Sequence, residues 1–179
     1  MRMMTKCLMV VMSFLAGPVL GQTVQTVPQV DLQRYVGIWY EIARLPNKFQ
    51  AQCAGDVTAE YVQRTDGAID VINRCQKADG SIDQAIGKAK VVDARSNAKL
   101  KVRFAPAWLS WLPMVWGDYW VLDLASDYSL AAVGEPGRDY LWVLSRTPAV
   151  PEANYQALLG RLQAQGFDTA RLVKTRQAP

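Results

Sequence analysis

Short runs in which apolar residues alternate with polar ones occupy most of the chain between residues 38 and 145. Each run is five to eight residues long, and turn-forming residues separate it from the next. Alternation with a period of two is typical of strands that have one buried face. The predicted strands span residues 38–45, 57–62, 69–74, 87–92, 100–104, 119–124, 128–133 and 140–145.

Turn signals between the runs favour antiparallel pairing of neighbouring strands. Asp66-Gly67 and Asp79-Gly80 are the dipeptides that tight hairpins prefer, and Pro136-Gly137 separates the last two runs. No helical pattern lies between the runs, so parallel strands joined by crossover helices are not expected. The chain is therefore predicted to be all-β, an antiparallel meander that forms a sandwich or an up-and-down barrel.

A helical pattern follows the last run. It begins at Pro151, which suits a first helical turn, and Gly166 provides a stop. Its apolar residues fall at i, i+3, i+4 and i+7 and form one stripe, so we expect the helix to pack on the outside of the sheet. The segment 170–174 is expected to add an edge strand. The stripe consists of Tyr155, Leu158, Leu159 and Leu162.

The first 21 residues have the features of a secretory signal peptide. Arg2 and Lys6 supply its positive charge, and the apolar stretch 8–16 is too short to span a bilayer. We expect cleavage near Gly21, followed by a flexible leader at 22–29; a retained N-terminal anchor is the alternative. Lipid modification is not expected, because Gln22 stands where it needs a cysteine.

Composition narrows the classes of function. The 179 residues suit one domain, and without the first 21 the chain has 18 basic and 16 acidic residues, a net charge of +2. That surplus is too small to predict a nucleic-acid partner. The two remaining cysteines, Cys53 and Cys75, predict a disulfide in an exported chain, with two buried thiols as the alternative. Since the chain has no histidine, neither a zinc site nor another cofactor is expected.

Three short motifs occur in a characteristic order. The sequence G-I-W-Y-E at 37–41 opens the first run, Ser126-Asp127-Tyr128 precedes the seventh, and Arg146 follows the eighth. In this order, around eight strands and ahead of a helix, the motifs resemble those of the lipocalin family. The surrounding residues are most similar to bacterial lipocalins and apolipoprotein D. The resemblance covers a domain at residues 30–174, which leaves 175–179 as a tail.

The resemblance implies an eight-stranded antiparallel up-and-down β-barrel with a C-terminal α-helix packed outside. In the family the motif tryptophan closes the barrel floor and the arginine lies across its ring. Carried over, Arg146 stacks on Trp39, a contact worth about 1–2 kcal/mol if desolvated. Gly37 lets the chain turn closely into the first strand. Together with Asp127, these residues mark the fold rather than a site of ligand chemistry.

Strand alternation from an inward Trp39 predicts which side chains face the barrel interior. Lys101 and Arg103 are expected to face water, and both cysteines fall at the open end. An apolar, aromatic pocket with a few polar groups suits an acyl chain with a small polar end. The alternative is that many of these side chains simply fill a small barrel. The predicted ligand-binding residues are Glu41, Ala43, Ala59, Tyr61, Val71, Asn73, Ala89, Val102, Phe104, Tyr119, Val121, Tyr140 and Trp142.

Glu41 is the one acid among these inward positions. An unpaired buried carboxylate is expensive, so we expect it to hydrogen-bond a tyrosine or a basic group near the floor. We assign it a structural role rather than a catalytic one, because general acid–base chemistry would need a histidine or a second inward acid.

The connection at residues 105–116 is unusually apolar and contains Trp108, Trp111 and Trp116. Its two prolines disfavour a continuous strand or helix. By strand alternation the loop lies at the open end, where exposed apolar surface marks a ligand gate or a membrane-touching surface. Plugging of the barrel and dimerisation are the alternatives.

We therefore expect a non-enzymatic carrier of a fatty acid, lysophospholipid or phospholipid. It would act in storage, transport or maintenance of envelope lipids, in the periplasm or in association with the outer membrane, as a monomer or homodimer. One alternative is an isomerase-like enzyme that uses a pocket thiol, which a disulfide would remove. Others are a membrane-surface protein with a plugged barrel, and an outer-membrane barrel, in which outward lysines would face lipid at a high cost.

Overall fold

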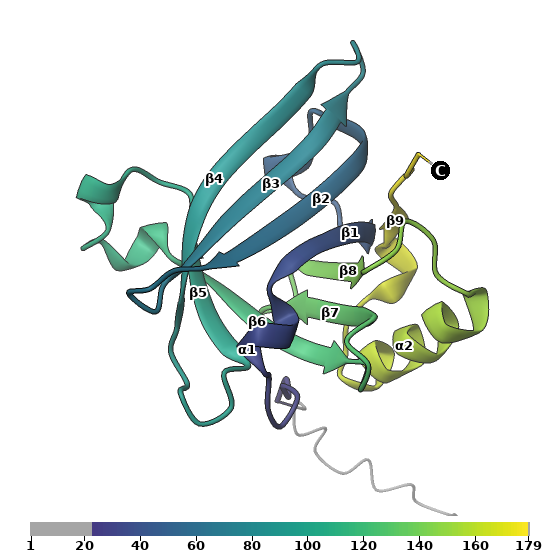
Figure 1. Ribbon diagram of the computed structural model, residues 1–179. Coiled ribbons are helices and arrows are strands. Elements are labelled where there is room, and N and C mark those ends of the chain that lie inside the picture. Colours follow the sequence, from purple (N-terminus) through teal and green to yellow (C-terminus); the bar gives the residue numbers. More distant parts are fainter. Residues whose placement is uncertain (1–22, 179) are drawn as a thin grey trace, which may run out of the picture.

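Eight antiparallel strands form a closed barrel in the computed structural model, which describes residues 23–178 (Figure 1). The predicted signal peptide at 1–21 lies outside the described residues. Each strand pairs with its neighbour in sequence, and the first pairs with both the second and the eighth, which closes the sheet. The barrel prediction is confirmed. The strands are β1 (Gly37–Arg44), β2 (Cys53–Gln63), β3 (Ile69–Lys77), β4 (Ile82–Val91), β5 (Lys99–Arg103), β6 (Gly117–Leu124), β7 (Leu130–Gly134) and β8 (Leu141–Ser145).

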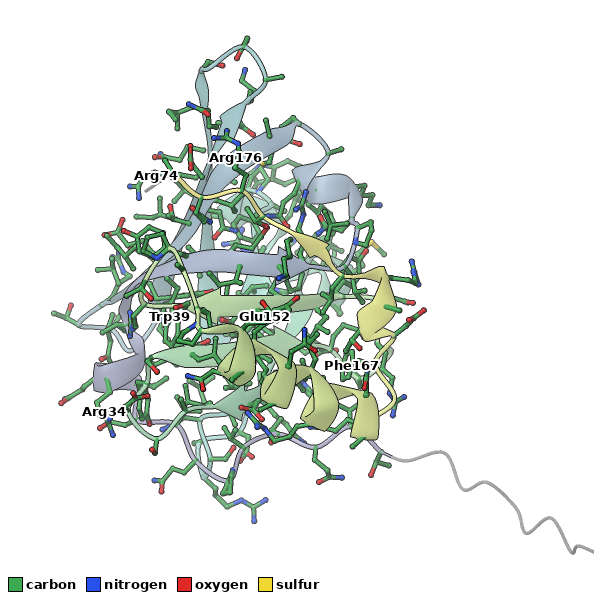
Figure 2. The ribbon with its side chains drawn as sticks, turned by 90° about the vertical axis from the view of Figure 1, so that its right-hand side faces the viewer. Arg34, Trp39, Arg74, Glu152, Phe167 and Arg176 are labelled. Atoms are coloured by element: carbon green, nitrogen blue, oxygen red, sulfur yellow. A yellow bond between two sulfur atoms is a disulfide. The ribbon has the colours of Figure 1, made fainter. Side chains whose placement is uncertain are left out.

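The remaining elements are short except for the C-terminal helix, α2, which packs on the outside of the barrel as predicted (Figures 1 and 2). Its residues Tyr155, Leu158 and Leu162 are buried against outward-facing side chains of the strands, in a second apolar core. These elements are α1 (Leu32–Tyr35), α2 (Glu152–Ala164), β9 (Val173–Lys174) and the 3-10 helices η1 (Lys48–Gln50), η2 (Ala107–Leu109), η3 (Pro113–Val115) and η4 (Thr169–Arg171).

Only β3 begins at the residue predicted for it, and β4 and β7 show two physical reasons for the differences in the other strands. β4 begins at Ile82 rather than residue 87, because its backbone pairs with β3 along a stretch whose side chains are largely exposed. Such a stretch has no buried face, so no apolar alternation marks it. β7 begins at Leu130 rather than residue 128, since Tyr128 has a φ of +64° and belongs to the preceding turn.

The barrel floor is built around Trp39, whose side chain is fully buried. The guanidinium carbon of Arg146 lies 3.9 Å from the centroid of that ring, as the family resemblance implied. The same guanidinium donates hydrogen bonds of 2.7–3.0 Å to the carbonyl oxygens of residues 34–36 and of Ile38. One cation therefore stacks on the floor and also ties the chain before β1 to the end of β8.

Two further motif residues, Gly37 and Asp127, stabilise the same end of the barrel. Gly37 enters β1 with a φ of +98°, and a Cβ there would lie 3.4 Å from Arg146 Nη1, so glycine suits both the backbone and the space. Asp127 accepts hydrogen bonds from the N–H and the hydroxyl of Ser129 at 3.0 and 2.7 Å. These bonds lower the pKa of the Asp127 carboxyl and close the turn before β7.

The described part of the predicted flexible leader at 22–29 has no regular secondary structure, but it is attached to the barrel. Val24 is buried in the core beneath α2, and the Val27 N–H donates a 2.9 Å hydrogen bond to the carbonyl of Val121. Gaining these contacts offsets the entropy lost by ordering the segment.

The C-terminal segment also belongs to the barrel wall. β1 pairs with β2 only up to Tyr40, and beyond that point β9 and the residues after it lie beside β1. The Gln177 amide donates to the carbonyls of Glu41 and Val57 at 2.7 and 2.9 Å, so it bridges the two diverging strands. Figure 2 shows the segment running from α2 to Arg176. As far as residue 178, the segment predicted to be a tail therefore forms part of the barrel wall.

Cys53 and Cys75 form the predicted disulfide, with their Cα atoms 5.6 Å apart. It joins the start of β2 to β3 and closes a loop with a sequence separation of 22 residues, worth roughly 3 kcal/mol in the chain-entropy account.

Replacing Arg146 by alanine is expected to lower the free energy of unfolding by about 2–4 kcal/mol, because a cation–π contact and several charge-assisted hydrogen bonds are lost together. Urea denaturation measures this change. Arg95→Ala is the control, since that side chain is 99% exposed. Equal stabilities of the two variants would contradict the role assigned to Arg146.

Candidate ligand-binding site

The barrel interior has a packed lower half next to the floor. Tyr61, Val71, Ala89 and Val121 face inward, as predicted, and each is at most 5% exposed. The cavity that remains among them has a volume of about 10 Å³, which is no larger than the space one water molecule needs. This half therefore has no room for a ligand. The cavity is lined by Leu32, Tyr35, Val36, Tyr61, Ile69, Ala89, Leu100, Val102 and Tyr119.

The upper half is the open part of the interior. Phe104 is 44% exposed although it follows β5 on the inward side. Small side chains line the wall formed by β2, β3 and β4, where Ala59 and Ala85 both pair with Asn73 in the strand register. A side chain that faces inward and is nevertheless partly exposed must line space that solvent can reach. The inward residues that are partly exposed are Ala59, Asn73, Val102, Tyr119, Tyr140 and Trp142.

Three tyrosines cluster beside the small cavity, and Tyr119 is the one of them that is partly exposed. The Tyr119 hydroxyl lies 2.8 Å from the hydroxyl of Tyr35 and 2.8 Å from that of Tyr61. Burial raises the pKa of Tyr61 to about 12 and raises the pKa values of Tyr35 and Tyr119 well above the usual value. All three phenols are therefore neutral at physiological pH.

A β-bulge changes which residues of β1 face inward. The register with β8 shifts between Glu41 and Ala43, so that Ala43 pairs with the outward-facing Val143. Ala43 is buried in the core beneath α2, and its predicted place in the pocket is wrong. The next residue, Arg44, pairs with the inward-facing Trp142 and takes that place. Strict alternation along a strand fails at a bulge because one extra residue is inserted.

Glu41 is 2% exposed and fully partnered. Its carboxylate accepts hydrogen bonds from the Gln50 amide at 2.6 Å and the Arg44 guanidinium at 3.3 Å, and a further one from the Thr175 hydroxyl. The predicted basic partner exists, but it lies on the upper wall rather than near the floor. The Arg44 Nε is buried without a partner, so the cluster keeps one free donor.

Aromatic side chains continue this wall towards the mouth of the barrel. Trp142 stacks on Tyr140 with ring centroids 5.9 Å apart, and its indole N–H donates to the Gln50 side chain at 2.8 Å. Phe49, which is 60% exposed, lies 5.7 Å from the Tyr140 ring. Sequence reasoning missed Arg44, Phe49 and Gln50, since the last two lie in a short loop that has no periodic pattern.

The loop at 105–116 projects away from the barrel (Figure 1). It contains η2 and η3 and no longer element, as its prolines predicted. Trp108, Trp111 and Met114 are 74%, 75% and 86% exposed, so they form a large apolar patch on the surface. The loop therefore does not plug the barrel.

Trp116 differs from the other tryptophans of this loop because it anchors the loop to the barrel. Its ring lies under Lys90 Nζ at 4.3 Å and the Arg103 guanidinium at 5.3 Å, and its indole N–H donates to the Ser110 carbonyl at 2.8 Å. Arg103, which we predicted to face water, packs against the Trp116 ring and is only 6% exposed. The prediction failed because alternation places a side chain on a face but does not show what covers that face.

No helix among residues 23–178 is long and apolar enough to cross a membrane. Within the same residues, no group of three or more Asp, Glu or Cys side chains is placed to hold a metal ion.

Comparison with known proteins identifies the family. Residues 30–177 match the model of the lipocalin-like domain, and the chain belongs to the lipocalin family. Members of this family generally bind small hydrophobic ligands.

Curated relatives come from plants, bacteria and animals. The chain is 40% identical over 156 residues to temperature-induced lipocalin-1 of Arabidopsis thaliana, covering 86% of this chain and 83% of that protein. It is 37% identical over 163 residues to the outer membrane lipoprotein Blc of Escherichia coli K12, covering 90% and 88%. Mouse apolipoprotein D is 31% identical over 157 residues, covering 83% and 77%.

Solved structures agree with the fold. Insecticyanin from the tobacco hornworm Manduca sexta superposes with a TM-score of 0.65 at 21% identity, covering 87% of this chain and 85% of that one. At this identity the likeness concerns the fold alone.

Proposed function

We propose that this protein binds and carries one acyl lipid, a fatty acid, lysophospholipid or phospholipid, in the upper half of the barrel. The observation that carries the proposal is the set of inward-facing apolar side chains that keep accessible surface above a packed floor. An acyl chain that enters this space gains the transfer free energy of its methylene groups, about 0.8 kcal/mol each.

The residues proposed to contact the ligand belong to the open half. Their side chains combine apolar surface with a few hydroxyl and amide groups, which suits a chain with one polar end. Tyr61, Val71, Ala89 and Val121 would support the site from the packed half below it. The proposed contacts are Ala59, Asn73, Val102, Phe104, Tyr119, Tyr140 and Trp142, with Glu41 on the upper wall.

We further propose that the protein acts in the cell envelope and catalyses no reaction. The N-terminal pattern of residues 1–21 favours export, and a relative named as an outer membrane lipoprotein supports an envelope location. The disulfide supports a carrier over a thiol-dependent isomerase, because both cysteines among residues 23–178 are bonded. Monomer and homodimer are equally compatible with this role.

The exposed patch of Trp108, Trp111 and Met114 is proposed to touch a membrane surface, where the protein would exchange its ligand. The loop at 105–116 contains no charged residue, and tryptophan favours the interface between lipid and water. If about 300 Å² of the patch entered a bilayer, the gain would be roughly 7 kcal/mol before entropic costs.

Ala59→Leu is expected to weaken fatty-acid binding about tenfold, because its added carbon atoms occupy ligand space; a loss of about 1.4 kcal/mol corresponds to that factor. Displacement of a fluorescent fatty acid measures the affinity. Thr58→Leu is the matched control, since residue 58 is the neighbouring position on the outward side of β2. Both variants would first be checked for native thermal stability. Unchanged affinity in a folded Ala59→Leu protein would contradict the proposed site.

Replacing Trp108 and Trp111 together by serine is expected to reduce binding to vesicles of phosphatidylethanolamine and phosphatidylglycerol by about tenfold or more, because each indole loses the transfer free energy of entering the bilayer. Flotation of the protein with the vesicles measures this. Ile86→Ser serves as the control, because Ile86 is 61% exposed on β4, outside the loop. Equal flotation of both variants and the unaltered protein would exclude the loop as the membrane contact.

A further inference from the structure

The three clustered tyrosines have three O–H groups but only two hydrogen bonds among them. Tyr35, Tyr61 and Tyr119 carry three O–H donors, and two hydrogen bonds join their oxygens. Among residues 23–178 these hydroxyls bond only one another. One O–H therefore always remains without a protein acceptor.

Burial decides which hydroxyl keeps the free proton. Tyr35 and Tyr61 are 4% and 5% exposed, whereas Tyr119 is partly exposed. A buried donor without an acceptor is unfavourable, so the stable arrangement has both buried phenols donate to the Tyr119 oxygen. The Tyr119 O–H then remains free to donate to an acceptor in the open half. Because its oxygen accepts two hydrogen bonds, cooperative polarisation strengthens this donor.

The strand above Tyr119 leaves the way to its hydroxyl open. Gly117 is the next residue of β6 on the inward side, two positions nearer the mouth. A Cβ placed there would meet no atom closer than 4.0 Å, the distance to Val102. Residue 117 therefore adds no side chain to the space above Tyr119.

The hydroxyl cluster suits a neutral oxygen rather than a charged headgroup. Its three side chains are phenols whose raised pKa values keep them uncharged. The only inward ion pair described above, Glu41 with Arg44, lies on the upper wall and is formed within the protein itself. An ionised carboxylate or phosphate at the base would be desolvated, which is strongly unfavourable, and the cation whose charge acts on Tyr35 and Tyr61, Arg146, is already engaged by the Trp39 ring and by backbone carbonyls.

We infer that Tyr119 is a ligand-binding donor that hydrogen-bonds an uncharged carbonyl oxygen at the buried end of the ligand. The inference rests on the proposed lipid-binding function and narrows its ligand class to acyl esters and protonated fatty acids that enter carbonyl end first. A phospholipid with its charged headgroup at the mouth would place only a methyl group beside Tyr119 and leave the donor unused.

The test uses methyl palmitate labelled with carbon-13 at its carbonyl, bound to the full-length mature protein. Infrared difference spectroscopy is expected to show the carbonyl stretch of the bound ester at a lower frequency than in hydrocarbon solvent. Tyr119→Phe should abolish this shift and weaken methyl palmitate binding about tenfold relative to hexadecane, which has no oxygen. Tyr61→Phe should retain the shift, since it leaves the Tyr119 O–H in place.

Gly117→Leu provides an independent test in case Tyr119→Phe fails to fold. Its side chain would fill the space above Tyr119, so the shift should disappear while Tyr119 itself is unaltered. A bound ester without a carbonyl shift in the unaltered protein would overturn the inference and leave the proposed carrier function standing. The inference would also be overturned by a shift that survives in Tyr119→Phe. A protein that bound neither methyl palmitate nor any fatty acid, lysophospholipid or phospholipid would overturn both the inference and the carrier function.

Discussion

The contact of Arg146 with Trp39 is the interaction on which the barrel's architecture depends. Arg146, at the end of β8, lies across the Trp39 ring of β1. It also donates hydrogen bonds to carbonyl oxygens at the start of β1 and in the segment before it. The two ends of the meander are thereby joined at one point, and that end of the barrel is closed to solvent. Because Trp39 and Arg146 close this end, the proposed ligand would enter at the other end.

The size of the inward-facing side chains changes with their distance from this floor. Large aromatic residues, Trp39, Tyr35 and Tyr61, occupy the lower half, whereas alanines and Gly117 line the wall above them. The same chain therefore builds a rigid base and leaves space above it. Polar groups inside are mostly satisfied by one another, as in the cluster around Glu41, so the proposed apolar ligand would leave few donors unpaired. Two exceptions are the buried Arg44 Nε, which has no partner, and the third O–H of the tyrosine cluster.

Periodicity and motif order were sufficient to predict the barrel, the outer helix and the floor contact, because each is a local pattern repeated along the chain or a property of the family. The disulfide was predicted separately, from the pair of cysteines in an exported chain. Periodicity and motif order were insufficient for Ala43 and Arg44. Which side of the sheet these side chains occupy depends on a bulge that the sequence of β1 does not indicate. Alternation also failed for Arg103, since its burial depends on how Trp116, at the end of a proline-containing loop, packs against the barrel. The C-terminal segment, predicted as a tail, packs because β1 and β2 diverge. Such tertiary contacts involve distant residues and leave no periodic signal.

Native mass spectrometry of the mature protein purified from the periplasm, followed by extraction and identification of any bound lipid, tests the central claim most directly. The account predicts a single acyl lipid bound to each chain, with its acyl portion released only when the barrel unfolds or a competing lipid is added. A protein that is empty on isolation and that takes up neither fatty acids nor lysophospholipids would contradict the account.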